Sequence, residues 1–333
     1  MFDAEPECDA ARWGAEVRES APGSMAAMGG QTSVVAPERE LALPARADLG
    51  LLALAVTAVS TSGPLIAAIS MPALAIAFWR NAIASCVLVP VAFVRRREIR
   101  SVLATTWRPM VGAGLLLAAH FAAWTYGVKL SSVASATALV ATQPAWSALM
   151  ARVRGAVINR LAWLGIALAI GATGALTGFD VTFSRAALVG DLLALAAGML
   201  AAGYVTVGAV ARRQASTVLY TTVCYGTAAC ALAIGAAAAR VPFSGYPLGT
   251  WLKILALTGG AQLLGHSVFN HVLRTTSPTV VSLAILFEVP GAAAIAALTL
   301  HQHLHLFHIP ALAVLIGALG LVVFAGGRAV PAE

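Results

Sequence analysis

Acidic side chains are nearly absent from most of this chain. Between Gly50 and Gly327 only four occur, namely Glu98, Asp180, Asp191 and Glu288. Hydrophobic residues make up 59% of the sequence and charged residues 11%, with a mean hydropathy of +0.85, whereas about 25% of residues are charged in an ordinary soluble domain. Long stretches can therefore lie in hydrocarbon without burying an ion, which predicts an all-α polytopic membrane protein.

Ten apolar stretches are long enough to cross a bilayer, since a spanning helix needs about 20 residues. They are Gly50–Ile69, Pro72–Val94, Met110–Val128, Val133–Met150, Leu161–Gly178, Leu188–Val210, Thr217–Ala239, Leu252–Val272, Thr279–Leu300 and Ile309–Ala325. Arginines gather in alternate loops, for example RRREIR at Arg95–Arg100 and the pair Arg212 and Arg213. By the positive-inside rule we expect both termini in the cytoplasm. The net charge of +7 is then explained by loop arginines, and no nucleic-acid partner is predicted.

The two halves of the chain resemble each other. His120–Pro144 and His266–Pro290 have His, Ser and Pro at matching places, and LLALA occurs at both Leu51–Ala55 and Leu192–Ala196. The shared order predicts two five-helix repeats, 47–178 and 187–328, after a polar, disordered cytoplasmic tail over residues 1–46. Because five is odd, the second repeat would be inverted relative to the first. Secondary transporters commonly bind substrate between such repeats.

Arg80 lies about two turns inside the second apolar stretch, where a charge costs roughly 2.5–3.5 kcal/mol at the helix centre. One interpretation is that it faces a polar cavity and meets an anion, either on a substrate or on a partner such as Glu288. The other is that it extends toward the interface and bonds backbone carbonyls.

Polar residues also share helical faces in two later stretches. Gln262, His266 and Asn270 follow at i, i+4 steps, and His120 and Trp124 do the same in the third stretch, so each set is predicted to lie on one face of an α-helix. Such faces either line a water-filled pathway or bond a neighbouring helix. Trp beside a polar donor suits an amphipathic organic solute, although plain packing is as common for Trp.

Glu288 lies in the ninth stretch, just before Val289 and Pro290. A low dielectric favours the protonated form of a carboxyl, which makes Glu288 a candidate for proton coupling. The alternative is a structural carboxyl at the helix break made by Pro290. Asp191, by contrast, is expected to cap the start of the sixth helix.

The sequence HQHLHLFH at His301–His308 raises the question of a metal site. No Cys, Asp or Glu joins these histidines, and alternate positions in an extended loop do not close a tetrahedron. An interfacial loop is the preferred interpretation, so no metal and no cofactor are predicted. Glycine pairs such as Gly259-Gly260 lie within apolar helix and not behind a strand, which argues against nucleotide-binding motifs and an enzyme.

These residues resemble a known family. Leu117–Leu149 is similar to the third and fourth spans of EamA-type transporters in the drug/metabolite transporter superfamily, and Gly190–Gly198 and Leu263–Ala293 are similar to the second half. An Arg in the second span, as in FWRNAIAS at Phe78–Ser85, matches a habit of the family. The resemblance implies ten spans, two inverted EamA repeats and export or exchange of small organic metabolites. It also implies a set of cavity-facing positions, namely Arg80, His120, Trp124, His266, Asn270 and Glu288.

The chain departs from the family pattern at one point in each repeat. EamA repeats usually end their fourth and ninth spans in Leu-Gly-Glu, whereas the corresponding segments here are Arg154-Gly155-Ala156 and Leu300-His301-Gln302. The family mechanism therefore does not transfer in every detail. A non-transporting membrane scaffold or sensor is the alternative that these missing carboxyls favour, with a metal-handling protein as a third hypothesis.

The sequence thus predicts a carrier in the cytoplasmic (inner) membrane that moves a small-molecule substrate by alternating access. The predicted pathway comprises Arg80, His120, Trp124, Gln262, His266, Asn270 and Glu288. The lipid bilayer surrounds the predicted carrier. A homodimer is common for such carriers, and nothing in the residues demands one.

Overall fold

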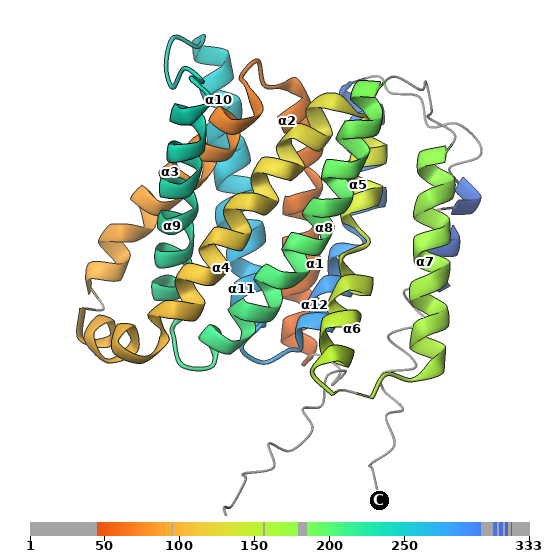
Figure 1. Cartoon of the computed structure of the whole chain (residues 1–333), viewed down its shortest axis with the longest axis horizontal. Coiled ribbons are helices and arrows are strands. Elements are labelled where there is room, and N and C mark those ends of the chain that lie inside the picture. Colours follow the sequence, from red (N-terminus) through yellow and green to blue (C-terminus); the bar gives the residue numbers. More distant parts are fainter. Residues whose placement is uncertain are drawn as a thin grey trace, which may run out of the picture. The chain divides into compact units, whose positions relative to one another are not determined.

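The computed structural model of the chain describes residues 45–94, 96–155, 157–178 and 185–300, and between 309 and 321 it describes 309–311, 313–315, 317–318 and 321. These residues belong to one compact unit, Glu38–Glu333. Every regular element among them is helical (Figure 1). The predicted tail, apart from residues 45 and 46, and the histidine-rich segment 301–308 lie outside the described residues.

The helices of the first half cover the predicted stretches. They are α1 (Arg46–Ser60), α2 (Ser62–Ala68), α3 (Ala73–Val94), α4 (Arg96–Leu130), α5 (Val133–Val140), α6 (Gln143–Val153) and α7 (Arg160–Gly178). Helix α4 begins at Arg96, well before the predicted start at Met110, so that Arg96–Arg100 and Arg108 are helical and not in a loop. Two predicted spans are each divided into a pair of helices, α1 with α2 and α5 with α6.

The second half is divided more often. Its helices are α8 (Arg185–Arg212), α9 (Thr217–Ala238), α10 (Leu248–Leu257), the π-helical η1 (Thr258–His266), α11 (Ser267–Val272), α12 (Pro278–Ile285) and α13 (Glu288–Thr299). The eighth predicted span comprises α10, η1 and α11, and the ninth comprises α12 and α13.

Among the described residues, five helical segments are long and apolar enough to cross a membrane. They are Arg46–Ala68, Ala73–Val94, Ala104–Leu130, Arg185–Arg212 and Thr217–Ala238. The other predicted spans are helical but broken, shorter or only partly described, so the number ten stays a prediction.

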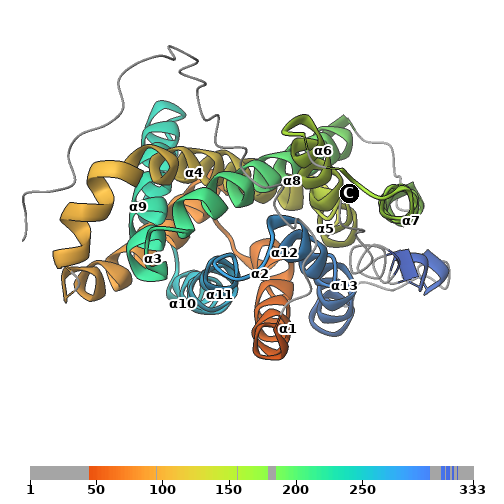
Figure 2. The ribbon, with the colours of Figure 1, turned by 90° about the horizontal axis from the view of Figure 1, so that it is seen from below.

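The two halves pack against each other through α1 and α8. Helix α1 contacts η1, α11 and α13, while α8 contacts α4, α5 and α6; Figure 2 shows α1 between α11 and α13. Small residues allow this approach. A Cβ on Gly198 of α8 would lie 2.9 Å from the Val140 carbonyl oxygen, and one on Gly265 of η1 would lie 2.5 Å from a Val59 methyl group. Close backbone contact of this kind is how helices associate in lipid.

Breaks in the fourth and ninth spans occur at corresponding places. Helix α6 begins at Gln143, directly before Pro144, and α13 begins at Glu288, two residues before Pro290. Proline suits the first turn of a helix because its missing N–H has no partner there in any case. Each span therefore ends one helix and starts another within its length.

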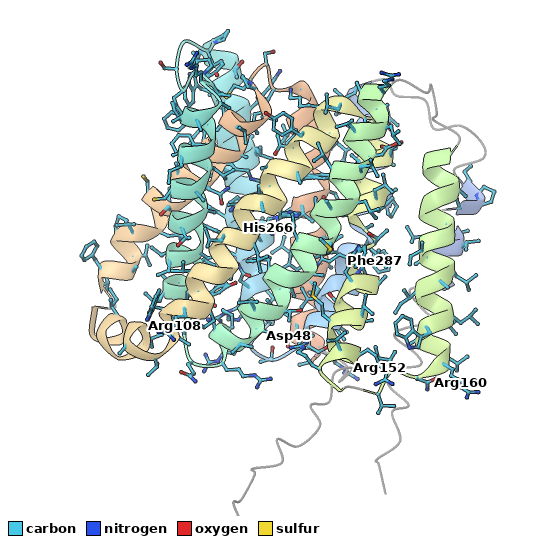
Figure 3. The ribbon with its side chains drawn as sticks, in the orientation of Figure 1. Asp48, Arg108, Arg152, Arg160, His266 and Phe287 are labelled. Carbon is cyan, nitrogen blue, oxygen red and sulfur yellow. The ribbon has the colours of Figure 1, made fainter. Side chains whose placement is uncertain are left out.

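Arginines mark one end of the bundle. Arg108, Arg152 and Arg160 lie at the same end as Asp48 of α1 (Figure 3). Arg212, counted above as a loop charge, is instead 1% exposed at the end of α8. Its Nε donates to the Asn270 carbonyl at 2.8 Å, its Nη1 donates to the Ala215 carbonyl, and its Nη2 donates to the Thr217 hydroxyl at 2.7 Å.

Candidate substrate site

A cavity of about 40 Å³ lies between the two halves. It is lined from the first half by Val59, Ser62, His120, Trp124, Val140 and Gln143, and from the second by Ala201, Tyr204, Val205, His266, Phe269, Asn270, Leu273, Ile285 and Glu288. Since a buried water needs roughly 10–15 Å³ by this measure, the space holds a few waters. A larger solute requires the surrounding helices to separate.

The second half brings hydrogen-bonding groups to this cavity. The Tyr204 hydroxyl of α8 donates to Asn270 Oδ1 of α11 at 2.6 Å. Asn270 is 1% exposed, and its Nδ2 has no hydrogen-bond partner among the described residues. An amide nitrogen carries two donors, so Asn270 keeps unused donor capacity beside the cavity that it lines.

His120 of α4 is oriented by a helix of the other half. Its Nδ1 lies 3.0 Å from the Ala197 carbonyl oxygen of α8. A carbonyl oxygen only accepts, so Nδ1 carries the proton in this contact. In the neutral imidazole the Nε2 atom is then an acceptor.

The broken spans place two helix starts at the cavity. Gln143 is the first residue of α6 and Glu288 the first residue of α13, and both line the cavity. The N-terminal end of a helix carries partial positive charge. In many carriers such half-helix ends face the substrate site.

Aromatic rings form one wall of the site. The His266 ring lies 6.4 Å from that of His120, 5.2 Å from that of Phe121 and 6.5 Å from that of Phe269, measured between centroids. His266 lies about midway along the helices (Figure 3). We call His120, Phe121 and His266 the aromatic wall; the two histidines line the cavity, and Phe121 packs against both of them without lining it.

Arg80 and Gln262 lie behind this wall and do not line the cavity. Arg80 is fully buried, and its Nε donates to Gln262 Oε1 at 3.0 Å. Gln262 Nε2 in turn donates to Asn81 Oδ1 at 3.0 Å. The Arg80 guanidinium carbon lies 4.0 Å from the centre of the Phe121 ring.

The structure thus divides the predicted pathway residues into two groups. His120, Trp124, His266, Asn270 and Glu288 line the cavity, while Arg80 and Gln262 bond each other beside it. Arg80 and Glu288 interact electrostatically, but neither Nη atom of Arg80 has a hydrogen-bond partner among the described residues.

The prediction that Gln262, His266 and Asn270 share one α-helical face assumed regular α-helix, and here it was wrong. Residues Thr258–His266 are π-helical. The wider π turn changes the angle between successive side chains. Gln262 bonds Arg80 and Asn81, whereas His266 and Asn270 line the cavity.

Two smaller expectations also differ from the structure. Asp191 does not cap α8, because that helix begins earlier, at Arg185. Asp191 instead accepts a hydrogen bond from the Ser131 hydroxyl at 2.5 Å, which joins α8 to the end of α4. When His120–Pro144 is aligned with His266–Pro290, Glu288 stands opposite Thr142, but the residue that lines the cavity is its neighbour Gln143.

Sequence reasoning missed Gln143, Tyr204 and Phe121. The Gln-Pro pair at Gln143-Pro144 was a usable signal, since it stands near the place of Glu288-Val289-Pro290 in the other repeat. Tyr204 and Phe121 have no such signal, because an aromatic residue in an apolar helix is most often plain packing.

Comparisons with known proteins agree with this architecture. A solved structure titled "Crystal structure of protein" matches with a TM-score of 0.68 and 17% identity, over 85% of this chain and 98% of that one; at this identity the likeness concerns the fold alone. The comparison with curated proteins found no match. A family model described as "EamA-like transporter family" matches twice, over residues 48–177 and 188–325. With two matches over most of its length and several helices able to span a membrane, the chain belongs to the EamA-like transporter family, a family of membrane transporters and not of enzymes.

Proposed function

We propose that this protein is a secondary transporter that carries small organic molecules across the cytoplasmic membrane by alternating access. The observation that carries the proposal is the cavity between the two halves, which residues of both halves line and to which His120, Asn270 and Glu288 bring polar groups. A site shared by two repeats can open to either side when the repeats move relative to each other.

The chemistry of the lining supports a solute with both polar and apolar parts. Asn270 offers donors and Glu288 a carboxyl, while Trp124 and Phe269 offer aromatic surface. Sites for small organic molecules typically combine apolar walls with a few placed polar groups. At about 40 Å³ the present space is too small for such a solute, so we assign this structure to a closed state of the cycle.

The buried polar groups favour the carrier over a non-transporting scaffold. A scaffold needs no polar interior, and packing apolar residues between the halves would avoid the cost of desolvating amide and carboxyl groups. Asn270 Nδ2, which lacks a partner among the described residues, is the group hardest to explain as structural.

Topology, direction and coupling complete the proposal. The repeats comprise 47–178 and 187–328 in inverted orientation, with both termini in the cytoplasm, as the arginine-rich end suggests. Transport runs as export or exchange. Glu288, the acidic residue at the cavity, carries a proton in the cycle.

Transport is tested by comparing the metabolites inside and outside cells that produce the wild-type chain or the variant Asn270→Leu. We expect at least one class of small molecule to accumulate outside the wild-type cells and to fall back toward the empty-vector level with Asn270→Leu. As a control, Thr57→Val alters an exposed hydroxyl that bonds only its own helix backbone and should export as the wild type does. Identical metabolite profiles for wild-type and empty-vector cells would count against the transporter.

A further inference from the structure

Arg80 is a fully buried cation with part of its hydrogen-bonding capacity unused. Its exposed fraction is 0%, and neither Nη1 nor Nη2 has a partner among the described residues. A guanidinium stays charged in proteins, and an unpaired buried charge is strongly unfavourable. The site is therefore arranged for an anion that this closed state does not place there.

The surrounding residues fix the direction of the guanidinium. Gln262 occupies the Nε atom, Asn81 orients Gln262, and the Phe121 ring covers one face of the guanidinium plane. The edge that carries Nη1 and Nη2 stays available. Two parallel N–H groups on a planar fork match the two oxygens of a carboxylate.

Arg212 shows what this fold does with a buried arginine that is structural. It is buried to the same degree, yet its Nε, Nη1 and Nη2 all donate to carbonyl or hydroxyl oxygens near the end of α8. Carbonyls at helix ends thus satisfy one buried arginine of this chain. Arg80 lies about two turns inside α3, where the backbone carbonyls already bond within the helix.

The free edge of Arg80 lies close to the transport cavity. Phe121, which covers Arg80, also packs against His266, and Arg80 interacts electrostatically with His120, His266 and Glu288. These last three residues line the cavity. Phe121 and His266 thus separate the Arg80 guanidinium from the cavity.

We propose that the Nη edge of Arg80 is a carboxylate-binding subsite of the cavity, which selects organic carboxylates. The inference rests on the proposed transport function. Two carboxylates can reach the subsite, that of the solute and that of Glu288, and the experiment below distinguishes them.

The test uses the purified full-length chain in detergent with two matched pairs of probes, propanoate with propanamide and benzoate with benzamide. Each pair differs in the carboxylate alone, and binding is measured as the rise in unfolding temperature with ligand concentration. The variants are Arg80→Gln, Arg80→Lys and Glu288→Gln. Arg212→Lys is the matched control for altering a buried arginine.

If the solute supplies the carboxylate, the wild type and Arg212→Lys bind at least one acid about tenfold or more tightly than its amide, and Arg80→Gln loses that preference. Arg80→Lys keeps the positive charge but lacks the two parallel N–H groups of the guanidinium, so its preference for the acid should fall about tenfold. If Arg80→Gln does not fold, the result with Arg80→Lys tests the subsite instead. If Glu288 supplies the carboxylate, the preference for the acid is absent in the wild type and present in Glu288→Gln, and this result would overturn the selection of solute carboxylates.

Equal binding of acid and amide by both the wild type and Glu288→Gln would overturn the subsite, as would an unchanged preference in Arg80→Gln. Because binding is measured at equilibrium without a membrane, it does not depend on transport. If the protein exports a solute but binds the acid no better than the amide, only the proposed subsite is refuted. If the protein binds the acid better than the amide but exports nothing, only the proposed transport function is refuted.

Discussion

Glu288 is 8% exposed at the start of α13, where its carboxyl lines a cavity shared by both halves. The sequence alone singles it out, since few acidic residues occur in the apolar region. Which groups surround it depends on helices far away in the chain. His120 and His266 line the same cavity from α4 and η1, and Arg80 acts on it electrostatically.

Replacing Glu288 by Gln removes the ionisable carboxyl at nearly constant volume. If this group carries the coupled proton, solute flux in proteoliposomes loses its dependence on a pH gradient while downhill exchange continues. Asp48→Asn is the control, since Asp48 lies at the end of the bundle and accepts a bond from Thr275. A pH-dependent flux that survives in Glu288→Gln would remove this residue from the coupling role.

At the scale of elements, the sequence predicts where apolar helices lie better than where they break. Pro290 suggests the interruption between α12 and α13, and Pro144 marks the start of α6. The π-helical η1 has no comparable signal, because a π turn arises from how a helix fits its neighbours as much as from its own residues. Of the two roles that the sequence left open for this face, Gln262 has the second, because it bonds the neighbouring helix α3.

Helix α4 and helix α9 approach closely at Gly114. A Cβ there would lie 2.6 Å from the Thr227 Cβ and 2.8 Å from the Cys224 carbonyl oxygen. Gly114→Ala should therefore destabilise the protein by about 1–3 kcal/mol through overpacking, seen as a lower unfolding temperature in detergent. At Gly235 of α9 a Cβ meets nothing within 4 Å. Gly235→Ala should therefore leave the unfolding temperature unchanged or raise it slightly. Equal behaviour of the two variants would contradict this packing.

At the scale of the whole molecule, one lysine hydrogen bond joins the two halves at the end opposite the arginines. α2 and α10 lie at that end (Figure 1). Lys253 of α10 donates to the Ala68 carbonyl at the end of α2 at 2.8 Å, and Lys129 of α4 donates to the neighbouring Ile69 carbonyl. The first bond joins the two family-matched segments, whereas the second lies within one of them.

Lys253→Met should weaken the closure at this end. An exposed charged contact contributes about 0.2–1 kcal/mol, so amide hydrogen exchange in α2 and α10 should accelerate roughly two- to fivefold. Lys129→Met is the matched control and should leave exchange in α10 near the wild-type rate. Similar acceleration of α10 in both variants would show that the bond between halves has no special part in closure.

The orientation in the membrane is a further prediction at this scale. Loop arginines that gather at one end place both termini in the cytoplasm by the positive-inside rule. A fluorescent protein fused after Glu333 should fluoresce, while alkaline phosphatase at the same place should be inactive. Active phosphatase would mean that the C-terminus lies on the opposite side.

The sequence by itself was enough to determine that this is a helical membrane protein of the EamA family with two similar halves. Hydropathy and repeat order are local or periodic properties of the chain, and a bilayer imposes helices on such segments because backbone groups cannot bond to lipid. The tertiary structure alone decided which polar residues meet. It showed that Asn270 bonds Tyr204 while Arg80 keeps an unused edge, since such contacts depend on how helices from both halves pack.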